Sequence, residues 1–499
     1  MITNRADNPF IKKFSDCGFF YIYDVNTNQL VEVEKSVYDI IDEYVDDKTN
    51  GIESPSNGTY GNQGIKEIME KINKARVENG LFSNFRPKKV TLGLNTADGV
   101  RELHAKGLSQ IIIEVSRICN CNCAYCATSG KYSKSKNFKI HMSRETCRKA
   151  VDFFCERALN SEDAYISFYG GEPLLRFDLI RETVEYVKTK YQNKKYSFNL
   201  TTNGTLINKE ILDFLIENDF SIMVSLDGPE HINDRYRRFK NGKGSFKRIL
   251  KNLEFIREYN KDYYSSRVSI SCVLAPPFDK IDDILDFFST YKIFKEIKDK
   301  IRSNTVDTSG TSFIEDFDLG DSFNDYSTIS NKFIERFKKA ILDNNLNNLT
   351  IEKTQVYNIL YNFAKRAVKS LYDHVQPLGA CHIGMRRVFV TTNGDFYICE
   401  RAGDNYKIGC VDHGFDYERI AFYYRKLEEV LEDCRSCWAI IYCERCWALI
   451  GNLDEFTGKR KEEFCTMNKK IIEKAFKLYT QLLREDPDCL KVFKDVIVG

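Results

Sequence analysis

The chain has 499 residues, and its 74 basic and 72 acidic side chains give a formal net charge of +2. This length exceeds one ordinary domain, so we expect a central catalytic domain with flanking modules. The balanced charge gives no bulk attraction to nucleic acid or membrane, and no apolar run reaches the roughly 18 residues of a membrane span. The first residues lack the apolar core of a secretory signal, which predicts a cytoplasmic protein. The charge balance and the lengths of the apolar runs predict neither a nucleic-acid nor a membrane partner.

The seventeen cysteines, against only six histidines, are the most informative part of the composition. In a reducing compartment, clustered thiols favour metal ligation over disulfides. Four cysteines lie within Cys119–Cys126 and, with Cys410 set aside, seven lie within Cys381–Cys465. We expect the isolated cysteines to be small core side chains.

Residues 1–100 are predicted to form a winged-helix-like module. The strand candidates Phe19–Val25 and Gln29–Val33 flank a turn-prone Asn-Thr-Asn segment. A helix capped by Ser36 should follow, and a second helix should stop at Gly80. The module has no basic stripe, so peptide binding is favoured over DNA binding.

From residue 108 to 310, apolar strands alternate with amphipathic helices. This pattern predicts an α/β fold, either a partial (β/α)6 TIM-like barrel or a doubly wound sheet, with chemistry at the carboxyl ends of the strands. Ser143 is expected to cap the first long helix. The expected strands are Ile111–Val115, Tyr165–Phe168, Phe198–Thr202, Ile222–Ser225, Val268–Leu274 and Ile301–Val306.

Beyond the expected barrel, the composition changes twice. Residues 311–378 are expected to form a helical bridge. A cysteine-rich domain is expected at residues 379–475 and a C-terminal helical tail at 476–499.

The segment after the first barrel strand contains CxxxCxxC, formed by Cys119, Cys123 and Cys126. Three thiolates can hold one face of a [4Fe–4S] cluster, which leaves one iron open for a further ligand. A zinc site that also uses Cys121 is the alternative. Thiols one residue apart chelate a tetrahedral ion poorly, so Cys121 is left out of the predicted ligands.

The CxxxCxYC motif resembles that of the radical S-adenosylmethionine superfamily, and further matching motifs end the later strands. Tyr169–Pro173 resembles the GGEP motif of that family. Arg237 best matches the arginine that pairs with the methionine carboxylate, with Arg235 and Arg238 as alternatives. The resemblance implies S-adenosylmethionine binding by Tyr125, Gly170, Gly171, Glu172, Pro173, Thr202, Asn203, Ser225, Asp227, Arg237 and Leu274.

The cysteine-rich tail resembles the SPASM extension of radical enzymes that modify peptides, which carries two auxiliary [4Fe–4S] clusters and brings the expected total to three. The implied ligands are Cys381, Cys399 and Cys446 for the first cluster, and Cys434, Cys437, Cys443 and Cys465 for the second. The fourth ligand of the first is left open, with Cys410 as a candidate. Two residues separate the last cysteine pair where the commoner pattern has three, and a zinc ribbon on Cys434, Cys437, Cys443 and Cys446 is the alternative.

The combined resemblance implies a maturase of a ribosomally made cysteine-rich peptide. It would use a 5′-deoxyadenosyl radical to form thioether bonds between a cysteine sulfur and a carbon. The N-terminal module would bind the leader of the precursor peptide, flavodoxin or ferredoxin would donate electrons, and Glu400 is a candidate base. The alternatives are an anaerobic sulfatase-type maturase that makes formylglycine, and a non-catalytic iron–sulfur electron carrier or peptide-binding protein.

Overall fold

The computed structural model describes residues 8–43, 59–126, 140–158, 161–162, 164–306, 326–346, 349–368, 371–402 and 405–493. The chain forms two compact units. The first contains Met1–Asn95, Ile359–Ala380 and Tyr424–Gly499, and the second contains Thr96–Asn358 and Cys381–Tyr423. Each unit therefore combines segments that are distant in the sequence.

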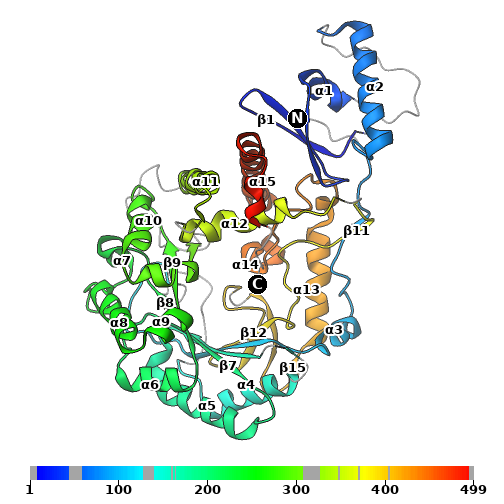
Figure 1. Ribbon diagram of the computed structural model, residues 1–499. Coiled ribbons are helices and arrows are strands. Elements are labelled where there is room, and N and C mark those ends of the chain that lie inside the picture. Colours follow the sequence, from blue (N-terminus) through cyan, green and yellow to red (C-terminus); the bar gives the residue numbers. More distant parts are fainter. Residues whose placement is uncertain are drawn as a thin grey trace. The chain divides into compact units, whose positions relative to one another are not determined.

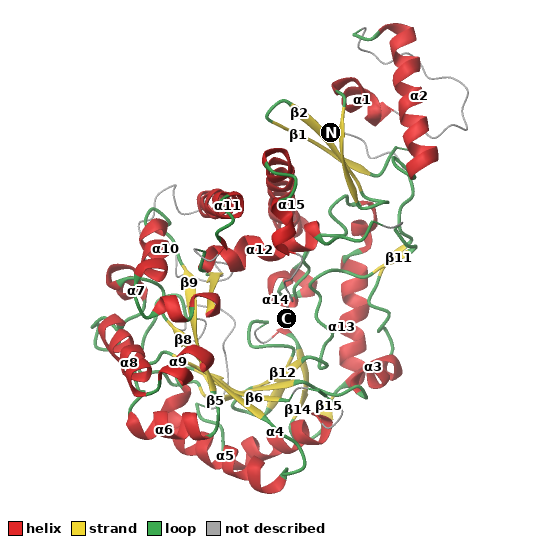
Figure 2. Ribbon diagram, viewed as in Figure 1, coloured by secondary structure: helices red, strands yellow, loops and turns green. Residues whose placement is uncertain are grey.

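A sheet with six consecutive parallel strands forms the centre of the second unit (Figures 1 and 2). All six expected strands form, and they lie side by side in chain order, which confirms the predicted α/β barrel-type fold. The strands are β5 (Gln110–Ser116), β6 (Tyr165–Gly170), β7 (Ser197–Thr202), β8 (Ser221–Ser225), β9 (Val268–Leu274) and β10 (Ile301–Thr305).

Helices cover the outer face of this sheet (Figure 1). Alternate residues of β5, such as Ile111 and Ile113, are fully buried, as a strand packed against helices requires. Ser143 caps α4 as predicted, because its side chain accepts a hydrogen bond from the N–H of Thr146 at 3.0 Å. The helices of the unit include α3 (Ala97–His104), α4 (Arg144–Arg157), α5 (Phe177–Lys190), α6 (Lys209–Glu217), α7 (Glu230–Tyr236), α8 (Phe246–Tyr259), α9 (Lys261–Arg267), α10 (Ile281–Thr290) and α11 (Tyr326–Leu342).

An unpredicted extension lengthens the same sheet beyond β5. The strand β12 (Arg387–Val390) pairs in parallel with β5, where Val388 lies opposite Ile111. Three antiparallel strands then follow, β13 (Asp395–Tyr397), β14 (Lys407–Cys410) and β15 (Gly414–Phe415). The stretch from Cys381 to Tyr423 therefore belongs to the unit that holds the barrel strands.

The first unit contains an antiparallel sheet of β1 (Ile11–Asp16), β2 (Phe19–Asp24) and β3 (Gln29–Val33), with α1 (Lys35–Ile40) and α2 (Gly61–Asn79) packed against it. Gly80 ends α2 in the left-handed conformation (φ 68°), as predicted. The predicted cap at Ser36 is wrong, because α1 starts one residue earlier and Glu34 is its N-cap. The hairpin was predicted, but the edge strand β1 was not.

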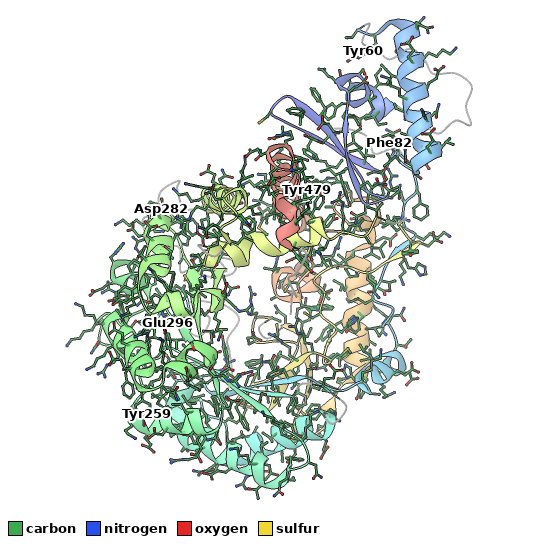
Figure 3. All side chains as sticks on the ribbon, viewed as in Figure 1. Tyr60, Phe82, Tyr259, Asp282, Glu296 and Tyr479 are labelled. Carbon is green, nitrogen blue, oxygen red and sulfur yellow. The ribbon has the colours of Figure 1, made fainter. Side chains whose placement is uncertain are left out.

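The turn between β2 and β3 is buried, whereas most hairpin turns lie on the surface. Asn28 is in the left-handed conformation (φ 56°) and accepts hydrogen bonds from the hydroxyls of Tyr23 and Tyr442, at 3.0 and 2.7 Å. Arg366 donates to the carbonyl of Asn28 at 3.0 Å and to the hydroxyl of Tyr479 at 3.1 Å. Tyr479 belongs to the C-terminal helix Gly458–Glu485 (Figure 3). The turn thus joins the sheet to three later segments of the chain.

The long helix α15 (Gly458–Glu485) completes the described part of this unit, together with α14 (Trp447–Ile450) and the short parallel pair of β4 (Lys89–Val90) and β11 (His374–Val375). The helix α12 (Ile351–Ala364) contains the division between the two units. None of the described helices is both long and apolar enough to cross a membrane.

Candidate active site

The predicted cofactor motifs gather at the carboxyl ends of β5 to β9. The cysteine loop of residues 119–126 follows β5, and the Gly-Gly-Glu-Pro segment follows from the last residue of β6. Thr202 ends β7, Ser225 ends β8, and Leu274 ends β9. Because parallel strands end at one edge of a sheet, residues spread over about 150 positions are brought to that edge.

The cysteine loop packs against the segment that follows α7. The N–H groups of Asn122 and Ala124 donate to the carbonyls of Arg238 and Tyr236, at 2.7 and 3.0 Å. Cys121 and Cys123 are buried, whereas Cys119 and Cys126 are half-buried. The main chain thus fixes the loop from outside while two of the three predicted ligands stay partly accessible.

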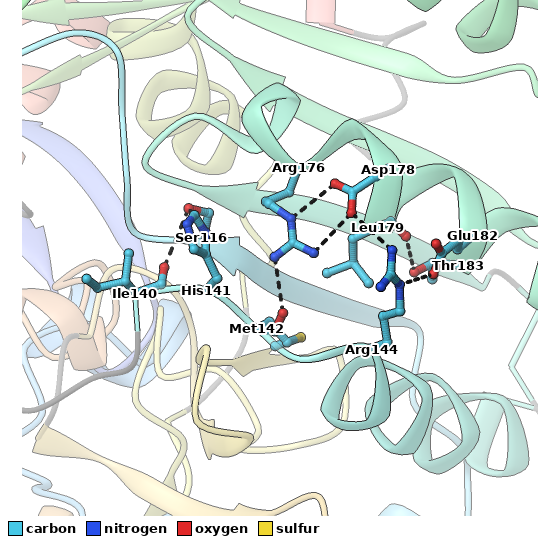
Figure 4. Close-up of polar contacts among 10 residues, drawn as sticks. All are labelled: Ser116, Ile140, His141, Met142, Arg144, Arg176, Asp178, Leu179, Glu182 and Thr183. Carbon is cyan, nitrogen blue, oxygen red and sulfur yellow. Dashed lines mark hydrogen bonds and ion pairs between the residues drawn. The ribbon is translucent and has the colours of Figure 1, made fainter.

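The base of the loop is closed where the chain returns to β5 (Figure 4). Ser116 Oγ lies 3.0 Å from His141 Nδ1, and the N–H of Arg117 donates to the carbonyl of Ile140 at 2.8 Å. Arg176 then donates to the carbonyl of Met142 at 3.3 Å. These contacts join the two ends of the loop, and residues 127–139 between them lie outside the described residues.

Gly170 and Gly171 let the end of β6 approach this loop closely. The N–H of Gly171 donates to the carbonyl of Ser116 at 2.8 Å, and that of Glu172 donates to Ile118 at 2.9 Å. A Cβ atom on Gly170 would lie 2.1 Å from the Ser116 carbonyl oxygen, and one on Gly171 would lie 2.4 Å from that of Ile118. The two glycines therefore serve backbone contact with the cysteine loop, which sequence reasoning did not foresee.

Glu172 is a buried carboxylate that joins β6 to β7. It accepts hydrogen bonds from the hydroxyl of Thr202 and the N–H of Asn203, both at 2.7 Å. Burial raises its pKa to about 7 although these hydrogen bonds oppose the shift. Pro173 follows it and opens a short 3-10 turn. Within the described part of the chain, Glu172 thus has the contacts of a residue that positions its neighbours.

Asn203 connects the end of β7 to the cysteine loop. Its amide nitrogen donates to Asn120 Oδ1 at 2.8 Å and lies 3.6 Å from Cys119 Sγ. The amide of Asn120 in turn donates to the hydroxyl of Thr205 at 2.8 Å. Sequence reasoning missed Asn120 and Thr205, and their positions inside or next to recognised motifs were the only signal.

Arg237, Asp227 and Tyr125 form a buried polar cluster beside the loop. The Tyr125 hydroxyl makes a short hydrogen bond to the Asp227 carboxylate and accepts one from Arg237 at 2.7 Å. Asp227 also accepts from the N–H of Val273 on β9 at 2.9 Å. Of the three candidate arginines, Arg237 is the one in this cluster, whereas Arg238 donates to the carbonyl of Gly242.

The thiols of the loop differ electrostatically. A hydrogen bond from the Cys121 thiol lowers the pKa of Cys119 to about 6, and burial raises that of Cys123 to about 11. The charge of Arg237 favours the thiolate at both ligands. Thiolates are the metal-binding form of cysteine. A cationic iron–sulfur core would favour the thiolates further, in the same direction as the charge of Arg237.

The match to a family model decides which domain this is. Residues 113–288 match the radical SAM superfamily. The chain contains a radical SAM domain. Enzymes of this superfamily use S-adenosylmethionine and a [4Fe–4S] cluster, and the match confirms the predicted resemblance of residues 113–288 to that superfamily.

Maturating enzymes are among the relatives of this radical SAM chain. The cysteine-type anaerobic sulfatase-maturating enzyme of Clostridium novyi is 34% identical over 163 residues, or 32% of this chain and 42% of that enzyme. The radical SAM cyclopropyl synthase TigE of Paramaledivibacter caminithermalis is 30% identical over 251 residues, or 48% of each chain. The chain thus spans about half or less of the length of these curated relatives.

A solved structure shares the fold of the radical SAM chain. Native anSMEcpe with bound AdoMet matches with a TM-score of 0.57 at 19% identity, over 78% of this chain and 100% of that one. At this identity the likeness shows the fold alone. It agrees with the predicted fold class.

The donor set of the radical SAM domain fits a [4Fe–4S] cluster. Three thiols lie on one eight-residue loop beside a buried cation. Among the described residues, no three His, Cys, Asp or Glu side chains converge on one point as the ligands of a single ion would. A cubane differs from a single ion, because each thiolate binds a different iron corner.

The cysteines of the tail fall into two groups in the radical SAM chain. Cys381, Cys399 and Cys410 belong to the second unit, where Cys410 ends β14, and Cys446 belongs to the first. The other four all belong to the first unit. Burial raises the pKa of Cys443, and the charges of the other three add to that rise, so the four lie close together. They are Cys434, Cys437, Cys443 and Cys465.

The candidate base Glu400 lies in the second unit next to Cys399. Its Oε1 is 3.4 Å from an Nη of Arg387, and its Oε2 is buried without a hydrogen-bond partner. The Glu400 charge also contributes to the raised pKa of Tyr169, as does Cys126. Tyr169 therefore lies near both the cysteine loop and Glu400, a relationship that the sequence did not predict.

Proposed function

We propose that this chain is a radical SAM maturase that forms thioether bonds in a ribosomally made cysteine-rich peptide. The carrying observation is the convergence of the cysteine loop with the Arg237, Asp227 and Tyr125 cluster at one edge of the sheet. When bound, S-adenosylmethionine and the cluster would supply a 5′-deoxyadenosyl radical. The residues of the chain would orient the cofactor and the substrate carbon and exclude water.

Three groups of residues would prepare this site. Cys119, Cys123 and Cys126 would hold the radical-generating cluster, and Arg237 would bind the methionine carboxylate. The remaining implied cofactor contacts would come from the strand ends, namely Gly170, Gly171, Glu172, Pro173, Thr202, Asn203, Ser225, Asp227 and Leu274. The buried hydrogen bonds of Glu172 and Asp227 support this role, because they fix those strand ends relative to the cysteine loop.

A polar inner face of the barrel supports a peptide substrate. Gln110 and Asn199 donate to the hydroxyl of Ser167 at 2.8 and 3.3 Å, on the strand faces that alternate with the helix-packed residues. The partly buried amides of Gln110 and Asn199 have further hydrogen-bonding capacity that a substrate segment would use. The leader would bind by adding a strand to β3, whose outer edge pairs with no other strand among the described residues.

The proposed tail ligands are Cys381, Cys399 and Cys446 for one auxiliary cluster and the four-cysteine set of the first unit for the other. In the overall reaction, a substrate C–H hydrogen leaves with the deoxyadenosyl group and a substrate thiolate forms the C–S bond. The electron released by bond formation balances the one that cleaves S-adenosylmethionine. An electron donor such as flavodoxin or ferredoxin would supply the first electron.

Formylglycine formation is the second candidate function. The buried, unpartnered Oε2 of Glu400 favours it, since a carboxylate oxygen reserved for a substrate proton suits oxidation of a cysteine or serine side chain. Similarity to sulfatase-maturating enzymes points the same way.

Anaerobic reconstitution tests the radical chemistry directly. We expect the purified protein to bind about twelve irons, as three clusters of four, and to form 5′-deoxyadenosine with dithionite and S-adenosylmethionine. Cys123→Ala should abolish deoxyadenosine, while Cys155→Ala, at a buried cysteine on α4 outside the motif, should retain it. No deoxyadenosine from fully loaded protein would contradict the proposal.

The product distinguishes the two candidate reactions. The probe is a synthetic cysteine-rich peptide, incubated with the loaded enzyme. A thioether removes two hydrogens and one alkylatable thiol per bond, whereas formylglycine loses sulfur from cysteine and gains a hydrazide-reactive aldehyde. A hydrazide-reactive aldehyde in a product that contains no thioether bond would favour the sulfatase-type reaction.

A further inference from the structure

The guanidinium of Arg445 is buried in the first unit, and no acidic side chain among the described residues pairs with it. The residue is 1% exposed, and it directly precedes Cys446. One Nη donates to the carbonyls of Ile440 and Cys443, at 3.2 and 2.9 Å. Its Nε is buried without any hydrogen-bond partner, and within the described part of the chain no carboxylate lies at ion-pair distance.

A counter-charge is expected at this place. An arginine side chain keeps its positive charge at any pH that a folded protein tolerates. Burial of a charge is costly unless an opposite charge or a full set of hydrogen bonds compensates it. The two main-chain carbonyls are dipoles and leave the net charge of Arg445 uncompensated.

Thiols that can become anionic lie near Arg445, which donates to the main-chain carbonyl of Cys443 at 2.9 Å. Burial raises the pKa of Cys443 to about 12, and the charge of Arg445 is the largest influence that opposes this rise. Burial also raises the pKa of Cys437, and the charges of Lys469 and, less strongly, Arg445 oppose that rise. As free thiols these groups are neutral and supply no counter-charge, but four thiolates around an iron–sulfur core carry a net negative charge.

We propose that Arg445 is the counter-ion of a [4Fe–4S] cluster held by Cys434, Cys437, Cys443 and Cys465, and that its charge raises the reduction potential of that cluster. This inference rests on the ligand set of the proposed function. It adds a residue that holds no metal and acts through the buried charge that it places beside the ligands. Arg445 is therefore a positioning and tuning residue.

The sign of the effect follows from the charges. Reduction adds one electron to an already anionic group, and a buried cation favours the more negative state. Arg445→Met keeps the length of the side chain and removes the charge, so it should lower the potential. We expect the ratio of reduced to oxidised cluster at a fixed potential to fall at least about tenfold, or about 59 mV for a one-electron couple.

The test is a dithionite titration of the fully loaded protein, followed by electron paramagnetic resonance, with an iron count for every variant. Arg445→Lys keeps a charge and should restore most of the potential, while Arg445→Gln should behave like Arg445→Met. Arg435→Met is the matched control. Arg435 lies between Cys434 and Cys437 but is half exposed and paired with Glu432 at 3.2 Å, so its loss should change the ratio less than threefold.

Three results would overturn the inference. One is an unchanged reduction potential in the Met and Gln variants when they bind as much iron as the parent protein. Arg445 would then only hold the two main-chain carbonyls. Another is an equal shift in the Lys variant. The third is zinc in place of iron on these cysteines. If deoxyadenosine still formed, this result would overturn the inference and leave the radical chemistry of the proposed function standing. Loss of deoxyadenosine with the expected shift would instead contradict the proposed function and spare the inference.

Discussion

The carboxylate of Glu172 accepts a hydrogen bond from the main-chain N–H of Asn203 at 2.7 Å, and this contact ties the end of β6 to the end of β7. Two strand ends that carry cofactor motifs are thus held by one buried acid. Because burial raises the Glu172 pKa to about 7, this acid also makes stability depend on pH.

The pH dependence has a definite sign. Between pH 4.5 and 7 the folded state keeps the Glu172 proton while the unfolded state has released it, so stability falls as pH rises through this window. This rise of the Glu172 pKa from 4.5 to about 7 corresponds to about 3 kcal/mol of unfolding free energy. Glu172→Gln does not titrate, and its unfolding free energy in urea should lose less between pH 5 and 8. Parallel profiles for the two proteins would contradict this assignment.

Gly171→Ala should displace the cysteine loop. The new Cβ would lie 2.4 Å from the carbonyl oxygen of Ile118, and that backbone cannot move without losing its hydrogen bond to Glu172. We expect a loss of about 2 kcal/mol of stability and of the iron bound at the radical-generating site, measured by urea unfolding and iron analysis. Gly64→Ala is the control. A Cβ at this position of α2 would make only an ordinary contact of 3.6 Å with Tyr60, so the unfolding free energy should rise by up to about 1 kcal/mol.

Tyr125→Phe should weaken the binding of S-adenosylmethionine without removing the iron. The variant deprives Arg237 and Asp227 of their shared partner, and a lost hydrogen bond to a charged group is worth about 1.5 to 3 kcal/mol, or tenfold or more in affinity. Equilibrium dialysis with the labelled cofactor measures this.

The choice among the arginines is tested in parallel, since Arg237→Met should abolish cofactor binding and Arg238→Met should leave the affinity within about twofold.

Tyr442→Phe should destabilise the first unit by about 1 to 2 kcal/mol, because it removes a buried hydrogen bond of 2.7 Å to Asn28. Asn28→Ala should cost more, and the double variant should cost less than the sum, since the two side chains share one contact. Urea unfolding measures all three. The exposed hydroxyl of Tyr259, bonded to Asp213, is the control, and Tyr259→Phe should cost less than about 0.5 kcal/mol. Strict additivity would exclude the contact.

The sequence predicted the elements whose signal is local. All six barrel strands formed within a few residues of their expected limits, although the sixth, Ile301–Thr305, has a single apolar residue. The strand β1 was missed because Lys12 and Lys13 interrupt its alternation, which edge strands tolerate. The strands β12 to β15 have two to four residues each. The pairing of β12 with β5 joins residues almost 280 positions apart, which no local pattern reports.

For the candidate site, residue types were predictable and contacts were not. The spacing of Cys119, Cys123 and Cys126 pointed to a cluster, and their assignment as ligands stays a prediction. The backbone hydrogen bonds of Gly171 and Glu172 to the loop depend on how strand ends meet in space. Arg445 was invisible in the same way, because its charge is informative only once its burial is known.

The buried turn at Asn28 has a consequence for how such proteins diversify. In many multidomain enzymes a recognition module is exchanged by recombination at an exposed linker. Here the turn is bonded to Arg366 and Tyr442, which lie hundreds of positions later in the chain. An exchange of the first ninety or so residues alone would leave those groups facing a foreign surface. Under the proposed leader-binding role of this module, a new substrate range would therefore have to arise by point substitution within it or by joint transfer of all three segments.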